Sequence, residues 1–366
     1  MNRLLVCLLS FCLLQTVSAD DLLTFGHKET INSEAFSGQR EYYIHLPESY
    51  EKEQDRKYPI LYILHGQWDL LSTVAVVDAI SNAIPELIVI GVNSKGLELR
   101  PPKNVDDSVN IKGEQFRSFF VNEFLPHIKQ TYRVADFSIL SGHSNSGRFV
   151  LNSFLDNPRL FNAYFAFSPS LDDGVINKRV MENVPAFTDS HSILFMTLAN
   201  EGEHMQVPYG ELIALIDQPK SNSTRFFHKE FPEQSHASTK IVSMLFSLES
   251  LFDGWQPSGA TQREGLAGLR SHYSGLTEKY GFNVQIPMHF ILRITYFYSA
   301  SDDEEENRKA AELVKFALDR NPDSIDDFIE LVEALNNQDQ EKGAERLTAF
   351  VCNKMSQHKF CAQAQR

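Results

Sequence analysis

The stretch Phe137-Ser-Ile-Leu-Ser-Gly-His-Ser-Asn-Ser-Gly147 decides the fold class of this chain of 366 residues. Its first four residues form a short apolar run typical of a buried strand, and residues 148–155 have the pattern of a helix. Small residues surround Ser144 between the two, so the sequence predicts a strand, a sharp turn and a helix with the serine at the apex. The usual motif, G-x-S-x-G, has a glycine where this chain has Ser146. A turn without chemistry is the alternative interpretation of the motif alone.

Short apolar runs alternate with helical patterns from Glu41 to Trp255. The predicted strands lie at residues 42–46, 59–65, 87–92, 137–140, 163–167, 193–198 and 224–228, and the longest predicted helix at about 113–132. Strands separated by helices predict an α/β fold, a mostly parallel sheet with helices on both faces. Because active sites of such sheets lie beyond the carboxyl ends of the strands, we expect the functional residues just after strands.

Two polar groups follow predicted strands in the order that a serine hydrolase of this fold requires. A serine hydroxyl becomes a nucleophile when a histidine takes its proton and an acid orients that histidine. Glu201 follows the run 193–198, and His236 follows the run 224–228. We therefore predict Ser144 as the nucleophile, Glu201 as the acid and His236 as the base, with Glu203 as the alternative acid.

Backbone amides are the expected stabilisers of the negative charge that develops on the ester oxygen. The Asn145 amide directly follows the nucleophile, and Gln67 lies in the loop after the strand 59–65. Gly66 allows that loop to approach closely. Trp68 is predicted to form a wall of the substrate pocket, although a buried structural tryptophan is the alternative.

Several stretches together resemble a known family. They are Tyr58-Pro-Ile-Leu-Tyr-Ile-Leu-His-Gly66, Ile139-Leu-Ser-Gly-His-Ser144, Asn200-Glu-Gly202 and Phe231-Pro to His236. In this order they resemble the α/β-hydrolase "putative esterase" family, which includes ferric-enterobactin-type siderophore esterases and, more distantly, S-formylglutathione hydrolase and feruloyl esterases. The resemblance implies an α/β-hydrolase fold and a serine carboxylic ester hydrolase that acts on a small-molecule ester without a cofactor. It assigns the same three residues to the catalytic triad.

The departures from the family pattern fall where substrate is held. Arg100-Pro-Pro lacks the Asp and Thr that commonly follow an arginine there, and Arg100 is predicted to bind substrate. The substrate thus stays open between a siderophore trilactone and a generic acyl or aryl ester. A ferric tris-catecholate is strongly anionic, so its binding would require a basic patch on this acidic chain. Lys95, Arg100, Lys103 and Arg148 would form that patch if their loops converge.

The N-terminus has the pattern of a secretory signal peptide. A positive start, an apolar run too short to span a bilayer and Val17-Ser18-Ala19 predict cleavage after residue 19. We expect a secreted or periplasmic protein whose mature chain has no membrane span. Cys352 and Cys361 are the cysteines left after cleavage, and in an oxidising compartment they favour a disulfide over two free thiols.

The net charge of −14 argues against nucleic-acid binding, which needs a basic surface. Removing residues 1–19 takes away only Arg3 and gives −15 for the mature chain. The cysteine spacing does not suggest a metal site, and the histidines are not clustered in the sequence. The acidic run 301–306 is expected to be solvated. No metal and no cofactor are predicted.

The last third of the chain has a different pattern. We expect the hydrolase domain to span residues 20–255, a linker to span 256–260, and an all-helical domain to span 261–366. A helix, an Asn-Pro-Asp turn at 321–323 and a second helix resemble a tetratricopeptide unit. This region either binds a protein partner or packs on the hydrolase domain, and packing is the favoured interpretation.

A different class of function is the alternative to catalysis. A non-catalytic hydrolase fold would serve as a binding or scaffold protein through its helical tail, and it would lack a member of the triad. All three members are present here. The oligomeric state and the partner of the tail are left open by the sequence.

Overall fold

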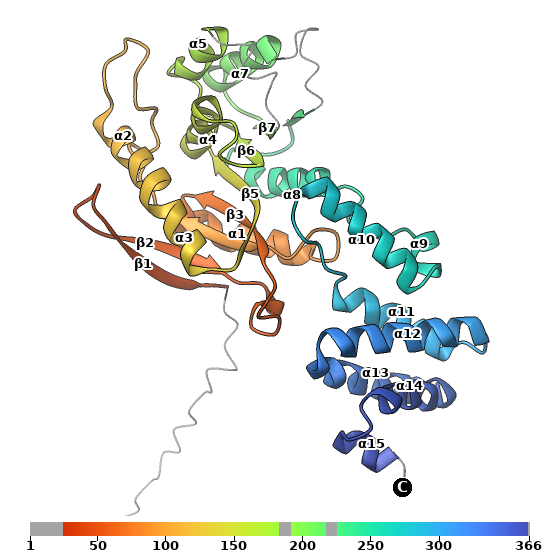
Figure 1. Ribbon diagram of the computed structural model, residues 1–366. Helices are drawn as coiled ribbons and strands as arrows, with labels where there is room; N and C mark the ends of the chain where they lie inside the picture. Colours follow the sequence, from red (N-terminus) through yellow and green to blue (C-terminus); the bar gives the residue numbers. More distant parts are fainter. Residues whose placement is uncertain (1–24, 183–191, 217–224, 365–366) are drawn as a thin grey trace, which may run out of the picture.

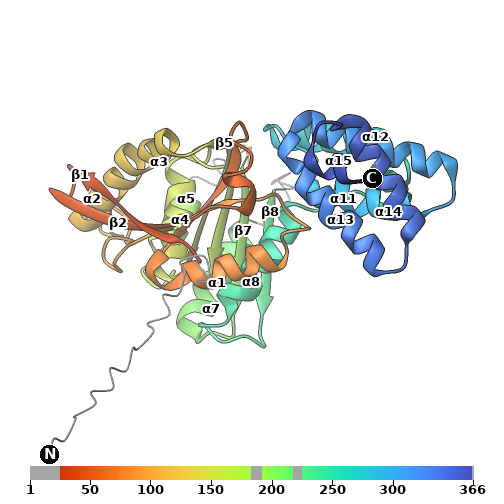
Figure 2. The same ribbon diagram turned by 90° about the horizontal axis from the view of Figure 1, so that it is seen from below.

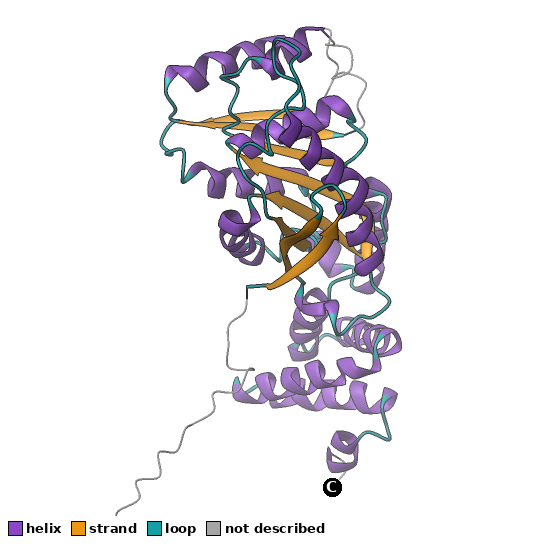
Figure 3. Cartoon of the chain, turned by 90° about the vertical axis from the view of Figure 1, so that its left-hand side faces the viewer, coloured by secondary structure: helices purple, strands orange, loops and turns teal. Residues whose placement is uncertain are grey.

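The computed structural model describes residues 25–182, 192–216 and 225–364. The expected signal peptide, residues 1–19, lies outside the described residues. The described chain forms a sheet covered by helices, and a purely helical C-terminal third lies beyond one end of it (Figure 1). Figure 3 shows the strands stacked between helices and the C-terminal region without strands.

The sheet has eight strands in the order β1-β2-β4-β3-β5-β6-β7-β8. The strands are β1 (His27–Ser33), β2 (Gly38–His45), β3 (Tyr58–Leu64), β4 (Ile88–Val92), β5 (Val134–His143), β6 (Ala163–Phe167), β7 (Ile193–Ala199) and β8 (Phe226–Phe231). The hairpin β1–β2 and the pair β2–β4 are antiparallel, and the remaining pairs are parallel. Every residue of β3, β4 and β6 is buried, as expected of parallel strands covered on both faces. The predicted α/β-hydrolase fold is therefore confirmed.

Helices cover both faces of this sheet (Figure 2). Because side chains alternate along a strand, Leu61 and Ile63 pack with α1 and α8, whereas Tyr62 and Leu64 pack with the helices of the other face. The first face carries α1 (Gly66–Ala79) and α8 (Thr239–Leu251). The second carries α2 (Ile111–Ser118), η3 (Phe119–Phe124), α3 (Leu125–Thr131), α4 (Asn145–Asp156), α5 (Val175–Glu182) and α7 (Glu203–Ile216).

The helix expected at about 113–132 is not one regular α-helix. A π-helical segment, η3, joins α2 to α3. Pro126 follows directly, at the start of α3. Proline has no N–H to donate to the preceding turn, so the regular hydrogen-bond ladder cannot continue through it.

The C-terminal region is helical throughout its described residues, as expected. It comprises α9 (Gly259–Arg263), α10 (Leu266–Tyr280), α11 (Met288–Ala300), α12 (Glu304–Arg320), η4 (Pro322–Ser324), α13 (Ile325–Asn337), α14 (Glu341–Lys354) and α15 (Lys359–Ala364). The acidic run begins α12, where the Asp303 carboxylate accepts from the amides of Glu305 and Glu306. Cys352 and Cys361 form a disulfide that ties α15 to α14. The resemblance to a tetratricopeptide unit and the domain boundaries stay predictions.

An aromatic junction joins this helical tail to the sheet. Phe137 of β5 lies 5.7 Å, between ring centroids, from both Tyr280 and Phe282 of the tail. Phe252 and Trp255, from the end of α8 and the segment after it, also contact Tyr280. The Tyr280 hydroxyl donates to the Leu251 carbonyl at 2.9 Å. These residues belong to one continuous hydrophobic core that extends from the sheet into α14.

Candidate active site

Ser144 lies at the apex of a tight turn between β5 and α4. Its backbone has φ 60° and ψ −121°, a strained conformation for a residue with a side chain. A Cβ added to Gly142 would lie 2.4 Å from the Ser146 carbonyl oxygen, so only glycine fits there. The turn therefore has the geometry that presents a serine hydroxyl above the sheet edge.

Ser146, which replaces the usual glycine of the motif, has a contact that explains it. Its buried hydroxyl donates to the His143 carbonyl at 2.7 Å and accepts from the His143 amide at 2.8 Å. A glycine could make neither bond. The serine at this position thus stabilises the turn that carries Ser144.

Glu201 and His236 contact each other across two neighbouring loops. Glu201 follows β7 and His236 follows β8, and the His236 Nδ1 and Glu201 Oε1 atoms are 2.6 Å apart. The Glu201 side chain is 7% exposed and that of His236 is 40% exposed. The Asn200 amide donates to the Gln234 carbonyl and holds the two loops together. Glu203, the alternative acid, begins α7, is exposed and makes no contact with His236 within the described structure.

His143 packs against the His236 ring. The two ring centroids are 4.4 Å apart. Burial, aided by the nearby His236 and Lys240, lowers the His143 pKa to about 3, so this imidazole is neutral near pH 7. His143 thus packs against the candidate base itself.

The Ser144 hydroxyl lies 3.4 Å from the Ser170 hydroxyl, and the Ser170 amide donates to the Ser144 carbonyl at 3.1 Å. No hydrogen bond joins Ser144 to His236 in the described part of the chain. In many enzymes the hydrogen bond between serine and histidine forms only when substrate is bound. Proton transfer here therefore requires the Ser144 hydroxyl and the His236 ring to come within hydrogen-bond distance. Ser170 was not predicted, although it follows β6 as the other site residues follow their strands.

The two amides expected to bind the ester oxygen both lie in first turns of helices. Asn145 begins α4, and Gln67 is the second residue of α1. Amides in the first turn have no partner within their own helix. The next two amides of α1, those of Trp68 and Asp69, differ from that of Gln67 because they donate to the carbonyl of His65, the residue before the helix. A Cβ on Gly66 would lie 2.2 Å from the Gly91 carbonyl carbon, which explains the glycine.

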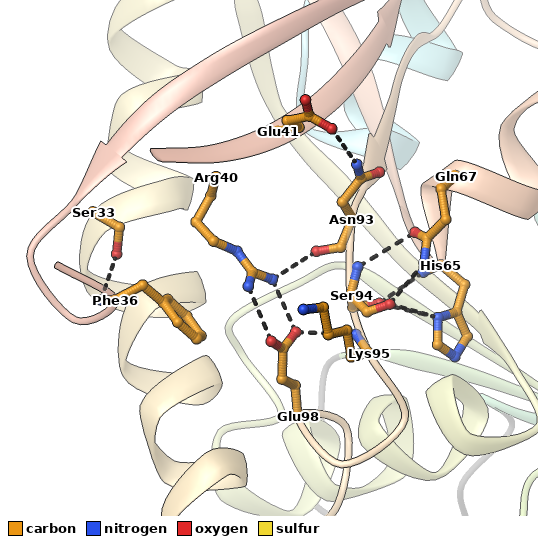
Figure 4. Close-up of polar contacts among 10 residues, drawn as sticks. All are labelled: Ser33, Phe36, Arg40, Glu41, His65, Gln67, Asn93, Ser94, Lys95 and Glu98. Atoms are coloured by element: carbon orange, nitrogen blue, oxygen red, sulfur yellow. Dashed lines mark hydrogen bonds and ion pairs between the residues drawn. The ribbon is translucent and has the colours of Figure 1, made fainter. Parts of the chain in front are cut away.

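A polar network holds the loop that follows β4 (Figure 4). Arg40 of β2 donates to both carboxylate oxygens of Glu98, at 3.0 and 2.9 Å, and to the Asn93 carbonyl at 2.9 Å. Glu98 in turn accepts from the Lys95 amide at 3.0 Å. The Gln67 side chain donates to the Ser94 carbonyl at 2.7 Å. The network fixes the Gln67 loop relative to the residues 93–98.

A cavity of about 470 Å³ lies beside Asn145, and basic side chains line it. Lys95 and Arg100 belong to it, and so does Lys112 of α2, which the sequence analysis did not select. The expected patch was wrong in its two other members. Lys103 lines a separate cavity, and buried Arg148 pairs with Asp173 at 2.6 Å.

Trp68 does not line the cavity beside Asn145. Its side chain is 67% exposed and lies against His65, with ring centroids 4.9 Å apart. The alternative of a buried structural tryptophan at this position is therefore wrong. Its predicted contact with substrate stays a prediction.

Within residues 25–182, 192–216 and 225–364, no helix is long and apolar enough to cross a membrane. The same residues contain no group of three or more side chains that could hold a metal ion.

Comparisons with known proteins agree with this architecture. A family model described as "Putative esterase" matches residues 33–238. An IroE-like serine hydrolase from Shewanella oneidensis has a TM-score of 0.62 and 20% identity, covering 79% of this chain and 98% of its own. An uncharacterised protein from Capnocytophaga ochracea has a TM-score of 0.62 and 16% identity, covering 90% of this chain and 94% of its own. A siderophore hydrolase from Aspergillus nidulans, EstB, has a TM-score of 0.52 and 17% identity, covering 66% and 97%. No curated protein sequence matches.

Proposed function

The chain belongs to the esterase family whose model spans more than half of its length, and from this membership we propose that it hydrolyses carboxylic esters through an acyl-enzyme on Ser144. Membership makes it a hydrolase of ester substrates. The identity of the nucleophile, base and acid is the proposal. The observation that carries it is the 2.6 Å contact between His236 Nδ1 and Glu201 Oε1, next to a serine on a strained turn.

The proposed reaction follows from that contact. With Nδ1 bound to Glu201, the other nitrogen of His236 is left to take the proton of Ser144, whose oxygen attacks the ester carbonyl. The Gln67 and Asn145 amides donate to the carbonyl oxygen as it becomes negative. The same histidine then protonates the departing alcohol. A water that loses its proton to His236 attacks the acyl-enzyme, releases the acid and restores Ser144.

Labelling by a fluorophosphonate probe tests this proposal directly, because such probes react with activated serines. We expect the intact chain to be labelled and to hydrolyse p-nitrophenyl butyrate, and Ser144→Ala to do neither. Removal of a triad serine costs on the order of a million-fold in kcat. Ser170→Ala removes a hydroxyl 3.4 Å away and is the matched control, which should still be labelled. Equal labelling of Ser144→Ala would refute the nucleophile assignment.

The compartment is part of the same proposal. The pattern of residues 1–19 favours export, and the disulfide between Cys352 and Cys361 fits an oxidising compartment. We expect the protein purified from its natural compartment to begin at Asp20. N-terminal sequencing of the exported protein checks this, and retention of residues 1–19 would contradict it.

The substrate proposed first is a siderophore trilactone, with a generic acyl or aryl ester as the second. The Aspergillus nidulans neighbour named as a siderophore hydrolase supports the first, through fold likeness alone. Comparing hydrolysis of p-nitrophenyl esters with that of iron-free and ferric catecholate siderophores separates the two. A probe-unreactive protein that hydrolyses none of them would favour the non-catalytic binding function.

A further inference from the structure

The cavity beside Asn145 lies next to the proposed nucleophile but belongs to a different part of the fold. Its walls come from the loop after β4, the start of α2 and the turn between β1 and β2. Asn145, which directly follows Ser144, is also one of its lining residues. A volume of about 470 Å³ is within the range of small-molecule sites.

Three cationic side chains reach this cavity, and no carboxylate in the described part of the chain pairs with them. Lys95, Arg100 and Lys112 line it, are exposed, and form no ion pair with any described residue. The one acidic residue of the lining, Glu98, is buried and has both carboxylate oxygens bound to Arg40. The cavity therefore carries an unbalanced positive charge.

This charge contrasts with the rest of the molecule. The full chain has a net charge of −14, and two other basic side chains near the site are paired, Arg148 with Asp173 and Lys240 with Asp69. An unpaired cluster of like charges repels itself, and a counter-charge in the same cavity relieves that repulsion. The remaining walls include the apolar side chains of Phe36 and Leu97. Apolar walls with cations fit an organic anion better than an inorganic one.

We propose that Lys95, Arg100 and Lys112 form an anion subsite that selects ester substrates bearing an oxyanionic group, either a carboxylate or an ionised catechol. The proposal rests on the proposed esterase function, because the subsite acts on the substrate that Ser144 attacks. An arginine fork matches such a planar group bidentately, and lysines supply point charges. Asn145 lies at the junction between the subsite and the reacting carbonyl.

A matched pair of esters tests the selectivity. Mono-p-nitrophenyl suberate and p-nitrophenyl octanoate have acyl chains of equal length, and only the first ends in a carboxylate. We expect the intact chain to favour the suberate ester in kcat/KM, and the preference to shrink as NaCl rises from low to high ionic strength. Lys95→Gln and Lys112→Gln should each reduce the suberate-to-octanoate ratio by about three- to tenfold, since each removes one charge facing the cavity.

Lys57→Gln is the matched control, because it removes an exposed lysine that lines none of these walls. It should leave the ratio unchanged. An unchanged ratio in both Lys95→Gln and Lys112→Gln, or a preference of the intact chain for octanoate, would overturn the subsite.

A binding measurement separates failure of the subsite from failure of the esterase proposal. Isothermal titration of Ser144→Ala with suberate, whose only polar groups are carboxylates, and with 2,3-dihydroxybenzamide, which carries a catechol and no carboxylate, needs no catalysis. Binding that weakens in Ser144→Ala/Lys112→Gln supports the subsite even if no ester is hydrolysed, and the stronger of the two ligands identifies the oxyanion. Absence of binding by both ligands would overturn the subsite even if the octanoate ester is hydrolysed.

Discussion

Phe137→Ala should destabilise the sheet and the helical tail together. Phe137 is 5% exposed, and its ring lies within 5.9 Å, between centroids, of the rings of Phe252, Tyr280 and Phe282. It is a residue of β5, and two of these neighbours belong to the tail. The substitution therefore removes a ring from the middle of the aromatic junction without touching the proposed catalytic groups.

The expected loss of stability follows from the apolar surface that Phe137 buries. Truncating an almost fully buried phenylalanine to alanine removes roughly 120 Å² of buried apolar surface. At 25 cal/mol per Å², this lowers the free energy of unfolding by about 3 kcal/mol. A cavity that the neighbouring rings cannot fill adds to this, and phenylalanine-to-alanine changes in cores cost about 3–5 kcal/mol. A typical domain has about 5–15 kcal/mol of net stability, so the variant should fold but unfold at much lower urea.

The chain offers two independent signals for the assay. It contains two tryptophans, and Trp255 is 3% exposed beside the junction whereas Trp68 is largely exposed. Tryptophan fluorescence in urea therefore reports mainly on the junction, and circular dichroism at 222 nm reports on all helices. If the sheet and the tail share one core, both signals of Phe137→Ala should shift together by the same amount.

Phe297→Ala is the matched control, because Phe297 of α11 is 64% exposed. Its free energy of unfolding should stay within about 0.5 kcal/mol of that of the intact chain. The argument fails if Phe137→Ala loses less than about 1 kcal/mol. It also fails if the fluorescence transition moves alone while the helical signal keeps its original midpoint, since the tail would then be an independent unit.

Three further predictions follow from the site and the tail. Glu201→Gln should lower kcat far more than Glu203→Gln, because only Glu201 contacts His236, and steady-state kinetics of both variants would expose a wrong acid if the order is reversed. The His143 pKa is lowered to about 3, so the unfolded chain binds this proton below pH 6.5 and the folded chain does not. The free energy of unfolding should therefore fall by up to about 1.4 kcal/mol for each pH unit between pH 6.5 and 3. Urea titrations of His143→Gln should show a free energy of unfolding that depends less steeply on pH than that of the intact chain. An equally steep dependence would mean that the His143 side chain is exposed and does not cause it. A chain ending near Gly259 should aggregate while its soluble fraction still reacts with fluorophosphonate, and a stable monomer with an unchanged Tm would argue for an independent tail.

Much of the site could be predicted because its residues follow a local rule. Ser144, Glu201 and His236 each lie in the turn or loop that follows a strand, and parallel strands bring such positions to one edge. The sequence pattern therefore identified residues that are 35 positions apart and in contact. The contacts of His143 and Ser170 depend on side-chain direction within the turn, which no periodicity reports.

The failures have equally specific causes. The strand β1 was not predicted because His27-Lys-Glu-Thr-Ile-Asn-Ser33 is largely polar and exposed at the sheet edge. Arg148 was assigned to the basic patch because its partner, Asp173, lies 25 residues away. Lys112 was missed because it comes from a helix rather than from a loop after a strand.

The aromatic junction also makes the tail difficult to lose over evolutionary time. A gene shortened after the codon for Gly259 would encode Phe137, Phe252 and Trp255 without the rings that cover them. Replacing all three with polar residues would restore solubility, but each replacement made while the tail is present buries an unpaired polar group. Purifying selection would thus retain the helices whether or not they ever acquired a binding partner.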